Sequence, residues 1–478
     1  MHLTPTTTVS PSMSASAGDD GQRLVTVVVL NWNGQALLPA CLDALRKQDL
    51  PQEAWQTWVV DNGSTDASLE LLARDYPEAH VVRNSANLGF AGGNNVAMRT
   101  VPTPFVVLLN NDAHPEPDWL RRLVAPMLAP GSQRLAATTS KILFEPRFLE
   151  LGLDTPSFRP PGDGRELGAL VSRVQTAAGG SVEDVTEHVL WERGAYGPEQ
   201  PAGQRFRWTR PRGTLLVPLA GHTTAPDGLR LLLTARAEQP KPLDLTWPGG
   251  HATVALTRED VDHQVPIPAG TTLNDVINNV GGIFHAPGYG ADRGYQEVDR
   301  GQYDQPEDVF LLCGAAVCLR TEALRDVGVF DDRFFMYYED TDLSWRLHAA
   351  GWDIRYLPDA VVRHLHSASS VEWSPFFTFH VERNRLLLLA KNAPAGLAAG
   401  QALRFQLTTA SMLRRGISTA WRERRRPPVR PTLLRLRVAG SCLRHLPSML
   451  RQRWTTAKPR EETSRRDLLR AWLAPPKQ

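Results

Sequence analysis

Two polar segments of the chain carry residue types suited to binding a nucleotide. Asp61 directly follows an apolar run and opens a glycine-containing turn. A carboxylate there can accept the imide N–H of a uracil or thymine ring, although an Asx turn or a helix cap explains it as well. Residues 84–95 are rich in Gly and Asn, which allow close backbone approach and offer donors to ribose or phosphate. A plain loop remains the alternative for this segment.

Two further segments contain ligands for a metal ion. Asp112 closes the sequence Asn110-Asn111-Asp112 at the end of the apolar run 105–109. A carboxylate at the carboxyl end of a strand is well placed to hold Mg²⁺ or Mn²⁺ on a diphosphate. His364 and His366 alternate after another apolar run, so on a strand they share a face and one of them would complete the site. A polar turn and ordinary surface histidines are the alternatives.

An acidic cluster within residues 330–346 is suited to proton transfer. Its acids lie among aromatic residues and include Asp332, Glu339, Asp340 and Asp342. Neighbouring carboxylates raise one another's pKa and aromatic walls desolvate them, so one member would act as a general base near neutral pH. The alternative is that Asp340 or Thr341 caps a helix while the other acids are solvated, and both can hold together.

The elements that position these segments alternate between strands and helices. The patterns predict strands over 24–30, 57–60, 80–82, 105–109 and 309–319, and helices over 37–45, 69–76, 341–350 and 376–389. Ser64 or Thr65 is expected to cap the second helix. This order predicts a mainly parallel sheet covered by helices on both faces. Ligands of such sheets bind at the carboxyl ends of the strands, where the polar segments fall.

The alternation of strand and helix patterns is interrupted in the middle of the chain. Residues 155–272 contain short apolar runs separated by Pro and Gly turns, which predicts an inserted antiparallel β-sandwich. Three helices are expected in the tail, over 403–421, 433–454 and 465–473. We therefore divide the chain into a leader (1–22), the first half of an α/β domain (23–154), an insert (155–272), the second half of the α/β domain (273–395) and a tail (396–478).

Composition sets limits on the class of protein. The chain has 478 residues, 42% of them hydrophobic, which is enough for two or three domains. Residues 396–478 hold 19 Lys and Arg against 4 acids, so a basic tail follows an acidic body. The four cysteines lack metal-binding spacing and suit reduced thiols. The sequence offers no continuous apolar run long enough for a transmembrane helix, and residues 1–22 are expected to be a disordered leader, not a signal peptide.

Together the motifs resemble the inverting family-2 glycosyltransferases of the GT-A fold, in particular their bacterial rhamnosyltransferase-like branch. The resemblance covers residues 24–150 and 275–392, about half of the chain. The motifs are, in order, VVVLNWNG, VVDNGSTD, NLGFAGGNN, LLNNDA, CGAAVCLR, FFMYYEDTDLSWRLHAAGW and HLHSASS. The resemblance implies a Rossmann-like α/β sheet, to which the β-sandwich and the basic helical tail are additions.

The resemblance also implies roles for individual residues. It assigns nucleotide-sugar binding to six residues: Asn31, Asp61, Asn87, Asn94, Asn110 and Asn111. Asp112 and His364 would hold Mg²⁺ or Mn²⁺, with His366 close enough to compete. Asn110 stands where many family members have Asp, which removes one metal-binding charge. The catalytic base would be Asp340, the second acid of a pair with Glu339. Contacts to acceptor or phosphate are implied for four residues: Arg346, His366, Arg383 and Asn384.

The implied reaction is an in-line displacement that inverts the anomeric carbon of a dTDP- or UDP-sugar. The implied acceptor is a polyprenyl-linked glycan of the cell wall or surface, so we expect a cytoplasmic protein at the inner face of the membrane. The basic tail is expected to bind anionic lipid, and the acidic body argues against a nucleic-acid partner. Alternatives are another sugar, such as galactofuranose, a protein acceptor, or an inactive scaffold whose insert binds glycan through Trp191, Trp208 and Trp247.

Overall fold

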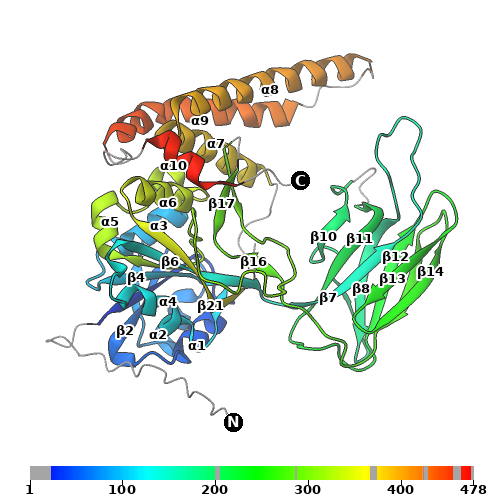
Figure 1. The fold of residues 1–478 in the computed structure, drawn as a ribbon, viewed down its shortest axis with the longest axis horizontal. Coiled ribbons are helices and arrows are strands. Elements are labelled where there is room, and N and C mark those ends of the chain that lie inside the picture. Colours follow the sequence, from blue (N-terminus) through cyan, green and yellow to red (C-terminus); the bar gives the residue numbers. More distant parts are fainter. Residues whose placement is uncertain are drawn as a thin grey trace, which may run out of the picture.

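The protein is described by a computed structural model that covers residues 23–199, 205–285, 288–365, 374–422, 424, 429–455 and 464–474. Figure 1 shows an α/β domain, a separate β-domain to one side, and helices of the C-terminal part lying over the α/β domain. The leader 1–22 and His366 lie outside the described residues.

The α/β domain is built on a mixed sheet that, within the described residues, has ten strands in the order β19-β21-β6-β20-β4-β1-β2-β3, with β16 beside β6 and β5 beside β21. The strands are β1 (Val25–Asn31), β2 (Trp55–Asp61), β3 (His80–Arg83), β4 (Phe105–Asn110), β5 (Ala113–Pro115), β6 (Leu135–Phe144), β16 (Ile277–Asn279), β19 (Glu307–Asp308), β20 (Ala316–Arg320) and β21 (Asp353–His364). β1 is parallel to β2 and β4, and β20 runs antiparallel to its neighbours.

Helices cover both faces of this sheet, as the sequence predicts. They are α1 (Leu38–Arg46), α2 (Ser68–Asp75), α3 (Gly89–Met98), α4 (Trp119–Leu128), α5 (Thr321–Val327) and α6 (Glu339–Ala349), and α7 (Pro375–Asn392) packs on α6. One core joins the sheet to α1, α2 and α4, and a second joins it to α3, α5 and α6. Val27 and Val28 of β1 contribute to opposite cores, which explains the continuous apolar run. The predicted α/β fold is confirmed.

Two local predictions are wrong. Residues 309–315 do not form a strand, because part of this segment bonds elsewhere: Leu312 N donates to Ser344 Oγ and Cys313 N to Thr139 Oγ1. Ser64 and Thr65 do not cap α2, which begins later, at Ser68. Both bond to the loop after β1 instead, and Asp66 accepts from the backbone N–H of Ser68.

The insert is an antiparallel sheet folded around its own core, and it begins before the predicted bound, with β7. Its strands are β7 (Arg147–Asp154), β8 (Leu170–Ala178), β9 (Ser181–Asp184), β10 (Leu190–Ala195), β11 (Arg207–Leu219), β12 (Arg230–Arg236), β13 (Lys241–Trp247), β14 (Gly250–Leu256) and β15 (Val261–Pro266). The long strand β11 pairs with both β7 and β8, which joins the two layers. Trp191, Trp208 and Trp247 pack into apolar clusters of this domain, so they serve its core.

The C-terminal part forms the helices α8 (Ala395–Arg422), α9 (Val429–Trp454) and α10 (Arg465–Trp472). α9 packs against α7, and α10 contacts α6. The last described strand, β22 (Leu473–Ala474), extends the hairpin of β17 (Gly282–His285) and β18 (Tyr289–Asp292). Trp472 stacks on Phe310 with 5.9 Å between ring centroids. The described part of the tail therefore packs on the second half of the α/β domain.

Candidate active site

Four polar residues lie where neighbouring strands of the sheet end. Asn31 is paired with Asp61 across β1 and β2, and Leu30 is paired with Asn110 across β1 and β4. Asn31 lies at the centre, because its Nδ2 faces Asp61 Oδ1 at 3.5 Å and its Oδ1 accepts from Asn111 Nδ2 at 2.9 Å. The parallel sheet thus brings together four of the six residues predicted to bind the nucleotide sugar.

Asn62, which the sequence analysis did not single out, organises the segment that follows β3. Its Nδ2 donates to Asn87 Oδ1 at 3.0 Å and to the carbonyl of Gly89 at 3.1 Å. Its Oδ1 accepts from Asn84 Nδ2 and from the backbone N–H of Leu88, both at 3.1 Å. One buried amide therefore fixes the loop that carries Asn87. Its position directly after Asp61 was the available signal.

The glycine-rich segment is mostly helix, not loop. Asn94 lies inside α3 and donates to the carbonyl of Phe90 at 3.0 Å, so its amide is used within its own helix. Gly93 is required for packing, because a Cβ there would lie 2.5 Å from Leu30 Cδ1. Asn95 ties α3 to the acidic segment by donating to the Phe330 carbonyl at 2.8 Å. These contacts give Asn94 a structural role and leave it out of the proposed binding residues.

The predicted metal ligands lie together although 252 positions separate them. His364 Nε2 is 3.0 Å from Asp112 Oδ1, and Asn110 Nδ2 is 3.5 Å from the same nitrogen. Both Asp112 and His364 are buried. A carboxylate oxygen and an imidazole nitrogen facing one another form a donor pair that fits a divalent ion. Among the described residues, no three His, Cys, Asp or Glu side chains gather at one point, so the remaining ligands would come from the diphosphate and water.

The predicted base lies at the first turn of α6. Burial, with a further contribution from the charge of Asp292, raises the pKa of Asp340 to about 6, although a hydrogen bond from the backbone N–H of Thr341 opposes the shift. Glu339 is more deeply buried, and burial and the neighbouring Asp340 raise its pKa well above the usual range. Asp340 is the less buried of the two acids, and its pKa lies close to the range in which a general base works. Asp340 is therefore the member of the pair suited to accept a proton.

The loop 313–315, which precedes β20 in the chain, lies in space between β4 and the start of α6. The backbone N–H of Asn110 donates to the Ala315 carbonyl at 2.9 Å. A Cβ on Gly314 would lie 3.2 Å from Phe90 and 3.8 Å from Asp340 Cβ. The loop 313–315 thus has the strand end that leads to Asp112 on one side and the base on the other. A larger residue than Gly314 would intrude between Phe90 and Asp340.

The segment before the base is held in an unusual backbone conformation. Phe335, Tyr337 and Tyr338 have φ angles of 65°, 70° and 68°, values that residues other than Gly rarely adopt. Asn384 of α7 donates to the carbonyls of Phe334, Met336 and Tyr337, each at 2.8 Å. The neighbouring Arg383 donates to the carbonyl of Arg333. Both residues therefore position the approach to Asp340, a role distinct from the predicted contact with acceptor or phosphate.

Arg346 also has a structural role. It is buried, pairs with Asp342 at 2.9 Å and donates to the carbonyls of Val327 and Val329 at 2.6 and 2.8 Å. Lys391 joins the same buried network through Asp342 at 2.8 Å and Asp331 at 3.0 Å. Because its guanidinium is committed to these partners, Arg346 is not an acceptor contact. The network instead fixes α6 against α7.

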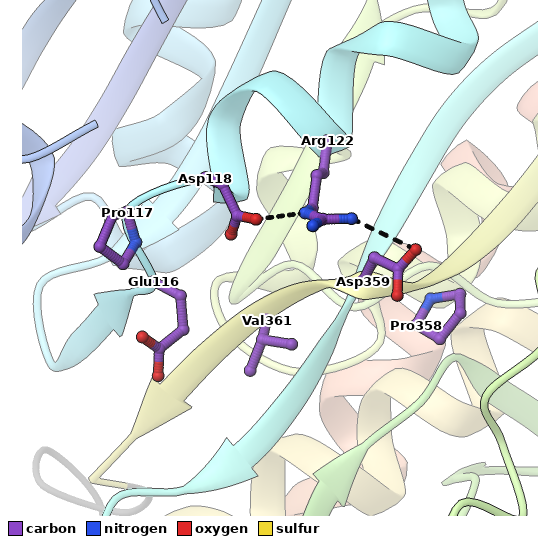
Figure 2. Close-up of a pocket in the computed structure, with 7 residues that line it drawn as sticks. All are labelled: Glu116, Pro117, Asp118, Arg122, Pro358, Asp359 and Val361. Carbon is purple, nitrogen blue, oxygen red and sulfur yellow. Dashed lines mark hydrogen bonds and ion pairs between the residues drawn. The ribbon is translucent and has the colours of Figure 1, made fainter. Parts of the chain in front are cut away.

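A separate cavity of about 590 Å³ lies between α4 and a bulge in β21. Figure 2 shows Arg122 there between Asp118 and Asp359, with ion pairs to both. Arg363 neutralises the remaining acid, Glu116, at 3.4 Å. None of the residues that the sequence analysis singled out lines this cavity. It is therefore distinct from the candidate active site.

Comparison with known families agrees with this geometry. The sequence matches Glycosyl transferase family 2 over residues 26–186 and Glycosyl transferase family group 2 over residues 289–380. The mixed α/β sheet that carries these segments has the architecture of the GT-A fold. The two matched segments identify the α/β domain as a glycosyltransferase family 2 domain.

Individual relatives match shorter segments. The chain is 47% identical over 64 residues to the N-acetylglucosaminyl-diphospho-decaprenol L-rhamnosyltransferase of Mycobacterium tuberculosis, covering 13% of this chain and 20% of the relative. It is 39% identical over 83 residues to a pre-mycofactocin glycosyltransferase of the same species, covering 16% and 17%. These alignments span about a fifth of each relative. A mannosyltransferase from Pyrobaculum calidifontis, solved with GDP-Man and Mn²⁺, is 13% identical over 89% of this chain and 88% of its own, with a TM-score of 0.38, too low to support an inference.

Proposed function

We propose that this protein is an inverting, divalent-metal-dependent glycosyltransferase that moves a hexose from a nucleoside diphosphate sugar to a lipid-linked glycan. The observation that carries the proposal is the placement of Asp340 and the Asp112–His364 pair on the two sides of the loop 313–315. In this arrangement the base would act on the acceptor hydroxyl while the metal-binding pair holds the diphosphate end of the same donor.

The chemistry is a single displacement at the anomeric carbon. Asp340 accepts the proton of an acceptor hydroxyl as that oxygen bonds to the anomeric carbon, and the bond from this carbon to the diphosphate oxygen breaks. Proton transfer of this kind contributes about 10²- to 10⁴-fold to the rate. Asp112 and His364 would hold Mg²⁺ or Mn²⁺, which as a Lewis acid stabilises charge on the departing diphosphate. Attack from the face opposite the leaving group inverts the configuration.

The polar residues at the strand ends indicate the class of donor, and the matched relatives indicate the class of acceptor. Asp61, Asn31 and Asn111 offer a carboxylate and amides that suit the base and ribose of a UDP- or dTDP-sugar. The first relative named above acts, by its name, on N-acetylglucosaminyl-diphospho-decaprenol and transfers L-rhamnose. We infer a rhamnose-type sugar and a polyprenyl-linked acceptor of the cell wall or surface, used at the cytoplasmic face of the membrane.

The test combines donor binding with product analysis. Thermal unfolding should show stabilisation by UDP or dTDP only when Mn²⁺ or Mg²⁺ is present. Transfer to polyprenyl-diphosphate-linked N-acetylglucosamine should then give a product of inverted configuration by NMR, with activity lost in Asp340→Asn. Transfer of galactofuranose would redirect the sugar assignment. No nucleotide binding with any metal would overturn the proposal and favour an inactive, glycan-binding scaffold.

The C-terminal helices offer a surface for the membrane that the lipid-linked acceptor requires. Exposed apolar residues recur at helical spacing on α8 as Leu403, Leu407, Ile417 and Trp421, and on α9 as Leu433, Leu436, Leu443, Leu450 and Trp454. Trp421 is 83% exposed and Trp454 is 73% exposed. An apolar cavity of about 540 Å³ opens on α8 beside Ile417 and Trp421. Within the described residues, no helix combines the length and apolar character needed to cross a bilayer.

The charge of this part favours anionic lipid as the partner of the exposed apolar residues. Arg404, Arg414, Arg415 and Arg422 lie on α8 together with the apolar residues. Each basic residue near an anionic membrane contributes about 1 kcal/mol. The two helices are joined by Arg435 of α9, which donates to Thr409 Oγ1 of α8 at 2.8 Å. We infer that α8 and α9 lie on the membrane surface as a pair.

Flotation with liposomes tests this surface. The full chain should float with vesicles that contain phosphatidylglycerol and should remain in solution with phosphatidylcholine alone. The variant Leu407→Asn/Ile417→Asn/Trp421→Gln should lose flotation, whereas Leu128→Asn, which alters an exposed leucine of α4, should retain it. Equal flotation of the two variants would exclude α8 as the contact.

A further inference from the structure

The imidazole of His364 also contacts Asn278, which lies outside both segments matched by the family models. His364 Nδ1 lies 3.2 Å from Oδ1 of Asn278, and the contact is buried. Asn278 lies in β16, the first strand of the α/β domain after the insert. β16 and β21 both pair with β6, so Asn278 and His364 approach one another from strands on the same sheet.

This contact determines which nitrogen of His364 faces Asp112. An amide oxygen only accepts, so Nδ1 must carry the hydrogen when it faces Asn278 Oδ1. In the neutral ring, Nε2 then presents a lone pair toward Asp112 Oδ1, 3.0 Å away. A lone pair facing a carboxylate is unfavourable unless a cation lies between or beside them. The hydrogen bond therefore prepares a nitrogen that can bind a metal.

We propose that Asn278 is a positioning residue that fixes the ring orientation and the tautomer of His364 so that Nε2 binds the divalent ion. The inference rests on the proposed function, since it assumes that Asp112 and His364 hold the metal. Partners of this kind commonly change metal affinity by about 10- to 100-fold when they are removed.

The next residue, Asn279, provides a matched control. It is also buried in β16, but its Nδ2 donates to Asp292 Oδ1 at 2.5 Å and its Oδ1 accepts from the backbone N–H of Gly281 at 2.8 Å. Substituting it disturbs the same strand without removing the contact to His364. The pair therefore separates an effect on the ring from a general weakening of β16.

The experiment measures Mn²⁺ binding by electron paramagnetic resonance, with UDP present, on the full chain. Asn278→Leu should weaken Mn²⁺ binding by about 10- to 100-fold. Asn278→Asp, which keeps an accepting oxygen, should restore affinity to near the level of the unaltered chain. Asn279→Ala should leave Mn²⁺ affinity unchanged even where it lowers the melting temperature. Circular dichroism confirms that each variant is folded.

The possible results distinguish a failure of the proposed metal site from a failure of the proposed role of Asn278. If the unaltered chain binds no Mn²⁺ with UDP, or if Asp112→Asn binds it equally well, the proposed metal site itself is wrong. If the unaltered chain binds Mn²⁺ and Asn278→Leu binds it with the same affinity, the positioning role is wrong while the metal site stands. Equal losses in Asn278→Leu and Asn279→Ala would also overturn it, since the effect would then come from the strand.

Discussion

His364 and Asp112 lie with Nε2 and Oδ1 3.0 Å apart, although the entire β-sandwich separates them in the sequence. β5, which begins directly after Asp112, pairs with β21 so that Ala113 is opposite His364. The backbone N–H of Leu365 donates to the Asp112 carbonyl at 3.0 Å. Backbone pairing therefore fixes this donor pair before any ligand binds.

Asp112→Asn should abolish the metal-dependent part of nucleotide binding. The amide keeps the shape of the side chain but removes the charge that attracts a divalent ion. For the unaltered chain, a nucleotide at one hundred times its dissociation constant should add about 2.7 kcal/mol to the free energy of unfolding. Thermal shift with UDP and Mn²⁺ measures this gain. A gain of equal size in Asp112→Asn would contradict the assignment.

The rate of transfer should fall as the pH drops through about 6, because the pKa of Asp340 is raised to about 6 and only the ionised form accepts a proton. A kcat/KM profile from pH 5 to 8 shows this limb. In Glu339→Gln the limb should remain, since we assign the proton transfer to Asp340 and not to Glu339. If the limb disappears in Glu339→Gln, the group that titrates is Glu339, and the assignment of Asp340 as the base is wrong.

Asp340→Asn should make the protein more stable above pH 6 while it removes activity. The pKa of Asp340 is raised on folding from 3.8 to about 6, so burying its charge opposes folding at neutral pH. The contribution of protonated Asp340 to the free energy of unfolding is complete below about pH 4 and is lost as the pH rises through about 6. Melting temperatures at pH 5 and 8 test this: the advantage of the variant should be larger at pH 8. A lower melting temperature at pH 8 would contradict it.

Asn384→Ala should lower kcat more than it raises KM for the donor. Its two N–H groups are shared among three carbonyls of the loop 334–337 before Asp340, and a hydrogen bond of this kind contributes about 1 kcal/mol to stability. The groups that we propose bind the nucleotide lie on other elements, so nucleotide affinity should change little. Steady-state kinetics and nucleotide titration measure both effects. Loss of nucleotide affinity in proportion to kcat would indicate general unfolding.

Lys391→Met should cost about 3–5 kcal/mol of stability, because it leaves Asp331 and Asp342 buried without their shared cation. Although burial alone would raise it, Lys391 and Arg346 lower the pKa of Asp342 to about 2. The stability from this carboxylate is therefore complete above about pH 4 and is lost as the pH falls toward 2. Urea unfolding at pH 7 and pH 3 tests both statements, with Arg74→Gln at an exposed ion pair as a neutral control.

Much of the architecture could be predicted from the sequence, because local patterns reflect local physics. The run 25–29 reads as a strand buried on both faces, and Val27 and Val28 do enter opposite cores. Asp61 and Asn110 could be placed at one edge of the sheet because the carboxyl ends of neighbouring parallel strands meet there.

Only the tertiary structure decided which polar residues share a partner. Arg346 and Asn384 are residue types that often contact ligands. In the structure, however, Arg346 donates to carbonyls of residues 327–329 and Asn384 to carbonyls of residues 334–337. Asn278 shows no signal in the sequence, because its role depends on where β16 returns to the sheet after the insert. Hydrophobic periodicity specifies which face of an element is buried, whereas a hydrogen bond between distant strands depends on register and side-chain direction, which periodicity does not encode.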